Sequence, residues 1–185
     1  MRSSSSIIKS SDFTGRSRSQ YSKGPEGTKV FYNVTGMGVD ITSRTKGRKI
    51  SAPRLKRAAE KILEFLREDQ SELSLVLVGN EEIRELNATY RGKNRPTDVL
   101  SFPSGENQAE GLRILGDVVI SVEQAEIQAR KRRKTLEEEV RSLLIHGILH
   151  LLGYDHERSQ REARIMKGME KKIEQALCER RDLRV

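Results

Sequence analysis

The chain has 185 residues, of which 35% are hydrophobic and 4% aromatic, so it is long enough for one domain with a mostly aliphatic core. Its 35 Lys and Arg exceed its 27 Asp and Glu, and the net charge of +8 favours a polyanionic partner, although many basic proteins bind no nucleic acid. No apolar run reaches the roughly 20 residues of a membrane span, and no signal-peptide core is present. One cysteine, Cys178, excludes an internal disulfide, so we expect a cytoplasmic protein with no membrane segment.

The first 27 residues are rich in Ser, Arg, Lys and Gly and nearly free of apolar residues. Such a segment cannot bury enough surface to fold alone. We predict a disordered basic tail at residues 1–27, followed by a single domain at residues 28–185. An RNA-touching arm, an artefact of start-site choice and an organellar transit peptide remain alternatives for the tail.

The first predicted elements alternate between strand and helix. Residues 28–34 are β-rich and predict a strand, and residues 35–50, rich in Gly, Thr and Lys, predict a long loop. An apolar face of helical spacing predicts a helix over residues 51–69. A strand is expected at residues 72–78, and Asn80 is expected to cap the helix that follows.

A polar turn with three cations occupies residues 91–98. It leads into a short predicted strand at residues 99–102, a loop at 104–112 and another strand at 113–120. This stretch supplies the second half of the expected sheet.

The C-terminal part predicts three helices, each opened by a capping box: Ser121 with Gln124, Thr135 with Glu138, and Ser159 with Glu162. The middle one is apolar nearly all round and is expected to be buried. The four cations at residues 131–134 fit either a solvated helix end or an RNA contact. Because strands and helices mix without regular βαβ alternation, we predict the α+β class: a small mixed β-sheet packed with helices.

All three histidines lie within the buried helix and the turn after it, at His146, His150 and His156. The first two are four residues apart and share one helix face, and Gly153 can turn the chain so that His156 faces them. Three imidazoles that converge on one point suit a tetrahedral metal ion with one open position. The alternative is that the histidines bind no metal and are ordinary surface residues or hydrogen-bonded core residues.

The spacing of the three histidines matches the extended zinc-protease motif, a zincin-like metal-binding helix, but Gly147 stands where those proteases have the catalytic Glu. The missing carboxylate argues for a different hydrolysis on the same ligands. Attack on a phosphodiester needs cations to hold the phosphate. Arg91, Lys93 and Arg95 are the candidates, unless this stretch is an ordinary exposed basic turn.

Three separated motifs, HGILHLLGYDH, RGKNRPTDVLSFP and LGDVVIS, closely resemble those of the YbeY-type endoribonucleases, from about residue 28 to about residue 178. The resemblance implies a metal-dependent, single-strand-specific endoribonuclease of ribosomal RNA maturation, at the 3′ end of the small-subunit RNA, and of ribosome quality control. It implies ribosomal RNA and ribosomal subunits as partners, and leaves ribosomal-protein or GTPase partners open.

The resemblance also implies site residues. It implies one zinc-like ion per chain on His146, His150 and His156, with nickel or another divalent ion as the alternative, and Arg91 as the residue needed for cleavage. The resemblance implies that the ion and Arg91 face a shared basic cleft. Asp155 could orient a ligand or relay a proton, while Asp98 and Asp117 could support that cleft or be purely structural. An assembly factor with a structural metal, or a protease with a replacement carboxylate, are the rival interpretations.

Overall fold

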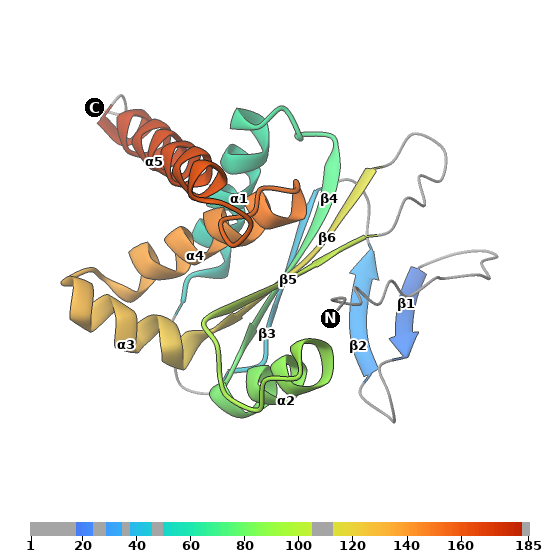
Figure 1. Ribbon diagram of the computed structural model, residues 1–185. Coiled ribbons are helices and arrows are strands. Elements are labelled where there is room, and N and C mark those ends of the chain that lie inside the picture. The colour runs from blue at the N-terminus through green and yellow to red at the C-terminus, as the bar shows by residue number, and fades with distance from the viewer. Residues whose placement is uncertain (1–17, 24–28, 35–37, 46–49, 105–112, 183–185) are drawn as a thin grey trace.

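A four-stranded sheet lies at the centre of the computed structural model, which describes residues 18–23, 29–34, 38–45, 50–104 and 113–182 (Figure 1). Its strand order is β3-β4-β6-β5. The pairs β3–β4 and β4–β6 are parallel, and β5 is antiparallel to β6. The strands are β3 (Val39–Ser43), β4 (Ser71–Val78), β5 (Val99–Pro103) and β6 (Arg113–Ser121). This mixed sheet with helices packed on it confirms the predicted α+β class.

The helices form layers on both faces of the sheet (Figure 1). α1 (Ala52–Phe65), α3 (Val122–Arg132) and α4 (Leu136–Leu151) lie on one side, and α2 (Asn80–Arg91) lies on the other. α5 (Gln160–Asp182) is an outer layer that packs on α1 and α4. None of the described helices is both long and apolar enough to cross a membrane.

β4 explains where the core sits, because this central strand is buried on both faces. Leu75 and Leu77 belong to the larger cluster, under α1 and α4, while Val76 and Val78 belong to a smaller cluster with Ile83 of α2. A strand buried on both faces is apolar along nearly its whole length, as β4 is. The larger cluster continues into α4, so the helix with two of the histidines is anchored in the main core.

A separate two-stranded hairpin precedes the sheet, formed by β1 (Arg18–Lys23) and β2 (Lys29–Val34). β2 confirms the strand predicted at residues 28–34. β1 lies inside the stretch predicted as a disordered tail, so six residues of that stretch are described as a paired strand. The rest of residues 1–27 lies outside the described residues, and the division of the chain at residue 27 stays a prediction.

The predicted loop at residues 35–50 is wrong for residues 39–43, which form β3. β3 is a short edge strand whose pairing with β4 depends on residues far along the chain. The local signal was the alternation of Val39 and Ile41 with polar residues, which is too short to stand out beside the Gly-rich flanks. The loop predicted at residues 104–112 lies outside the described residues apart from Ser104.

Of the four predicted helix caps, Thr135 is confirmed as a complete capping box and Ser159 as a cap without the return hydrogen bond. Thr135 and Glu138 form a reciprocal capping box on α4, and the hydroxyl of Ser159 accepts from the backbone N–H of Glu162. Asn80 is not the cap of α2: Gly79 holds that position.

The side-chain oxygen of Asn80 instead accepts from the Ser121 hydroxyl at 2.9 Å and the Gln124 amide at 3.0 Å. The Ser121 oxygen caps α3 as predicted by accepting from the backbone N–H of Gln124 at 3.2 Å. In a complete capping box the Gln124 side chain would also accept from the backbone N–H of Ser121, but here it binds Asn80 instead. A tertiary contact between α2 and α3 thus overrides the local pattern.

Candidate metal centre

The C-terminal end of α4 turns sharply and brings the third histidine back to the helix. The backbone N–H of Gly153 donates to the carbonyl of His150, and that of Tyr154 donates to Leu149, each at 3.0 Å. Gly153 has φ +87°, a left-handed conformation in which a side chain is strained. The glycine therefore permits the turn that carries His156 toward α4, as the sequence predicted.

The three histidines lie together. Ring centroids are 4.7 Å apart for His146 and His150, and 5.1 Å apart for His156 with each of the other two. The nitrogens that could serve as ligands lie within 4.8 Å of one another, and the Nε2 atoms of His146 and His150 are 3.1 Å apart. His146 and His150 are half-buried and His156 is exposed, so the cluster opens to solvent on one side.

The cluster fits a metal ion in geometry and in charge. Nitrogen ligands about 2.0–2.1 Å from a tetrahedral zinc ion lie about 3.3 Å from one another, close to the separation of the two Nε2 atoms. Burial lowers the pKa of His150, and the neighbouring charges of His146 and His156 lower it further. A neutral imidazole is the form that binds metal, so the site favours the ligand state of His150.

A carboxylate that we did not predict contacts the cluster from α5. The Nδ1 atom of His146 lies 2.8 Å from Oε1 of Glu170. The signal was present in the sequence, since Glu170 lies at the edge of the inward-facing stripe formed by Met166, Met169 and Ile173. Charged residues beside an apolar stripe are common, however, and the antiparallel packing of α5 on α4 was needed to reveal the contact.

The three predicted aspartates lie in different surroundings. Asp155 accepts from the backbone N–H of Glu157 at 2.8 Å and pairs with Arg158 at 3.1 Å. The hydrogen bond from Glu157 lowers the pKa of Asp155, and the charge of Arg158 adds to this effect. Both carboxylate oxygens thus act within the turn.

Asp98 accepts from the backbone N–H of Val99 and from the Gln128 amide, so it joins β5 to α3. Asp117 lies in β6, in register with Ser74 of β4 and Phe102 of β5.

The predicted cations lie at and just after the C-terminal end of α2. Arg91 is the last residue of α2, and Gly92 ends that helix at φ +67°. Arg91, Lys93 and Arg95 are exposed. Among the described residues, no hydrogen bond or ion pair involves the Arg91 side chain, and none connects it to a histidine.

Two neighbouring residues of the edge strand β5 connect the surroundings of Arg91 and His146. The hydroxyl of Ser101 donates to the carbonyl of Gly147 at 3.0 Å. On the other face of the sheet, the Phe102 ring packs edge-on against Tyr90, with centroids 5.0 Å apart. Arg91 follows Tyr90 in the chain, and His146 precedes Gly147. Each therefore lies next to a residue that contacts β5, on opposite faces of the sheet.

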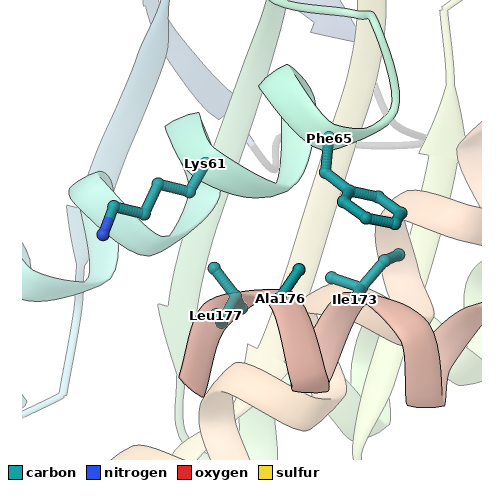
Figure 2. A pocket seen from close by; sticks show the side chains of 5 residues that line it. All are labelled: Lys61, Phe65, Ile173, Ala176 and Leu177. Carbon is teal, nitrogen blue, oxygen red and sulfur yellow. The ribbon is translucent and has the colours of Figure 1, made fainter. Parts of the chain in front are cut away.

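A groove of about 280 Å³ borders the histidine turn. It is lined by the turn itself, residues 152–155, and by Glu162 and Ile165 of α5. A second cavity, between α1 and α5, measures about 20 Å³ and is lined by Lys61, Phe65, Ile173, Ala176 and Leu177 (Figure 2). That volume suits about one water molecule, so of these two concavities only the groove could hold a larger group.

Comparison with known proteins identifies the family to which the chain belongs. The family model described as endoribonuclease YbeY matches residues 40–178. The chain belongs to the YbeY endoribonuclease family. This confirms the predicted family, with a match that begins at residue 40 rather than at about residue 28.

Relatives with the same name cover most of the chain. An endoribonuclease YbeY from Sulfurihydrogenibium sp. is 47% identical over 140 residues, which are 75% of this chain and 92% of the relative. One from Aquifex aeolicus is 48% identical over 130 residues, 70% of this chain and 86% of the relative. The solution structure of TM1509 from Thermotoga maritima matches with a TM-score of 0.55 and 36% identity over 78% of this chain and 92% of that chain.

Proposed function

We propose that this chain is a metal-dependent endoribonuclease of the cytoplasm that cleaves single-stranded regions of ribosomal RNA, with His146, His150 and His156 as ligands of one zinc-like ion. Its task is maturation of the 3′ end of small-subunit RNA and ribosome quality control. The observation that carries the proposal is the cluster of three imidazoles, open to solvent on one side, in a chain of the YbeY family. Imidazole ligands also suit nickel, so the native metal is decided by measurement.

The chemistry divides between the ion and the chain. A zinc ion held by three imidazoles supplies a Lewis acid that activates water near neutral pH. The three histidines would hold the ion, and RNA would lie over the side of the cluster that opens to solvent. Arg91 binds the scissile phosphate through two guanidinium N–H groups and offsets charge as the bond breaks.

The edge of the sheet supports this role for Arg91. Tyr90 and Gly147 pack on opposite sides of β5, against Phe102 and Ser101 respectively. β5 is an edge strand, so no further strand of the described sheet separates Arg91 from the histidines on that side. An RNA strand that crosses this edge can contact both.

A peptidase mechanism lacks its base here. The Cβ of a residue larger than glycine at position 147 would lie 2.6 Å from Val118 Cγ1, so a Glu does not fit between helix and sheet. Glu170 contacts Nδ1 of His146, not the Nε2 that faces His150. It therefore does not replace the missing carboxylate on the open side of the cluster.

Substitution of Arg91 tests the proposal. Arg91→Glu should retain zinc and melt normally but lose single-turnover cleavage of a ribosomal RNA fragment by roughly a hundredfold or more, like loss of one transition-state donor. Arg91→Lys should recover only part, because Lys cannot bind two phosphate oxygens in the same plane. Lys93→Glu, an exposed cation of the same turn, is the matched control for charge reversal and should retain more activity.

Two results would overturn parts of the proposal. Cleavage at the wild-type rate by Arg91→Glu would remove the phosphate role. Loss of zinc or of the cooperative melt would make Arg91 structural and transfer the search for the catalytic cation to Lys93 and Arg95. Zinc content is measured on the same preparations. Loss of cleavage caused by loss of the metal is thereby distinguished from loss of cleavage caused by loss of the Arg91 guanidinium.

A further inference from the structure

We infer that Glu170 is a positioning residue that fixes the imidazole of His146 with its Nε2 toward the other two histidines. The inference rests on the proposed metal centre and names the group that prepares one of its ligands. Its basis is the 2.8 Å contact between Glu170 Oε1 and His146 Nδ1.

The packing of α5 holds Glu170 in place. Met166 and Ile173, one turn to either side, are 1% and 0% exposed, so the helix is anchored in the main core around this point. The side chains of His146 and Glu170 are 28% and 30% exposed, respectively. Partial burial strengthens a hydrogen bond to a carboxylate relative to one in open water.

The contact selects one tautomer of the ring. A carboxylate accepts but does not donate, so the proton of a neutral His146 is held on Nδ1. The lone pair is then on Nε2, the atom that lies 3.1 Å from Nε2 of His150. A carboxylate on the far nitrogen also makes a ligating imidazole more basic, and loss of such partners typically weakens metal binding ten- to hundredfold.

The same helix pair offers a matched control one turn away. The hydroxyl of Ser142 donates to Oε1 of Glu174 at 2.8 Å, and Lys134 lies 4.0 Å from the same oxygen. Glu174 therefore makes a polar contact between α5 and α4 of the same length, but to a residue outside the histidine cluster. Substitution of either glutamate loosens the packing of these two helices, and only one of them alters a ligand.

The experiment measures zinc affinity of the full chain by competition with a chelator, together with melting of the metal-free protein. Glu170→Ala should weaken zinc binding by roughly ten- to hundredfold. Glu174→Ala should leave the affinity unchanged while lowering the metal-free melt about as much. Glu170→Gln keeps an accepting oxygen without the charge, so its zinc affinity should lie between those of Glu170→Ala and the wild type.

A second readout needs no metal. The chain has three histidines, so nitrogen-15 spectra of the rings can be assigned by substitution. In the metal-free protein, His146 should show a protonated Nδ1 in the wild type, because the carboxylate of Glu170 can only accept. In Glu170→Ala it should show a mixture of tautomers.

The outcomes separate the inference from the function beneath it. If the wild type and Glu174→Ala bind zinc, and Glu170→Ala binds it equally with an unchanged tautomer, the positioning role is overturned and the metal centre stands. Equal weakening in both alanine variants would make the contact purely structural. Absence of zinc binding in every protein, the wild type included, would overturn the metal centre itself.

Discussion

The side chain of His150 shows how single residues prepare the site. It is half-buried, and burial and the adjacent imidazoles lower its pKa. The neutral form that binds a metal is therefore favoured before any ion arrives. Little free energy is then needed to remove a proton when the ligand set closes.

Removal of this imidazole should release the metal. His150→Ala should carry no zinc after dialysis and should lose the rise in melting temperature that zinc gives the wild type, because metal binding free energy adds to folding. Zinc content and melts with and without a chelator measure both effects. Equal zinc content in the variant and the wild type would refute the assignment.

Glu72 is a buried carboxyl outside the site. It lies in β4 at 7% exposure, and its Oε1 has no hydrogen-bond partner among the described residues. Burial raises its pKa above the ordinary 4.5. Below pH 4.5 both the folded and the unfolded chain hold the proton, so the group does not destabilise the fold there. As the pH rises through the raised pKa, the folded state must ionise a buried group, and stability is lost.

Glu72→Gln should therefore melt at a higher temperature than the wild type near neutral pH, and the difference should vanish below pH 4.5. Thermal melts across this range measure it. A variant that melts lower than the wild type at neutral pH would show that the carboxylate is stabilised in the folded protein.

At the scale of elements, the seam between α4 and the sheet depends on one glycine. A Cβ at position 147 would lie 2.6 Å from Val118 Cγ1 and 3.3 Å from Ser101 Oγ, and Val118 is fully buried. Glycine lets α4 lie this close to β5 and β6. The residue that differs from the protease motif is thus fixed by packing between helix and sheet.

Gly147→Ala should lower the free energy of unfolding by about 1–3 kcal/mol, the usual cost of overpacking, as measured by urea denaturation. Gly168→Ala is the matched control, because Gly168 also lies in a helix but a Cβ added there would meet nothing within 4 Å. That control should stabilise by up to about 1 kcal/mol through helix propensity. Stabilisation by both substitutions would show that the seam has room.

At the scale of the whole molecule, the net charge of +8 bears on RNA binding, and the structure divides the four-cation run at residues 131–134. Arg132 donates to Glu139 at 2.5 Å, and that glutamate is 0% exposed. Lys134 contacts Ser142 of α4. Lys131 and Arg133 are exposed at the end of α3, so they are the members of the run that suit an RNA contact.

Lys131→Gln with Arg133→Gln should reduce the slope of log affinity against log salt for single-stranded RNA by roughly 0.7 for each phosphate that the variant no longer binds. Lys171→Gln with Lys172→Gln, exposed cations of α5, make the same change in net charge elsewhere. Filter-binding titrations at several salt concentrations compare the two pairs. An unchanged slope in the first pair would make those cations a solvated helix end.

Several structural features of this protein follow from short stretches of its sequence. The capping box at Thr135, the glycine turn at Gly153 and the four-residue spacing of His146 and His150 each depend on residues within one or two helical turns. The same short pattern of residues adopts the same local backbone geometry in most proteins, so these features could be predicted from the sequence. The three-histidine cluster followed from them, and the family followed from the resemblance of three separated motifs.

Only the tertiary structure decided contacts between segments distant in the chain. It brings Glu170 into contact with His146 and pairs β3 with β4. It also binds the side chain of Asn80 to Ser121 at the start of α3, so that Asn80 does not cap its own helix. Each of these residues has a local pattern compatible with another role. Which partner it meets depends on how helices and strands pack to bury the common core, and that is a property of the whole chain.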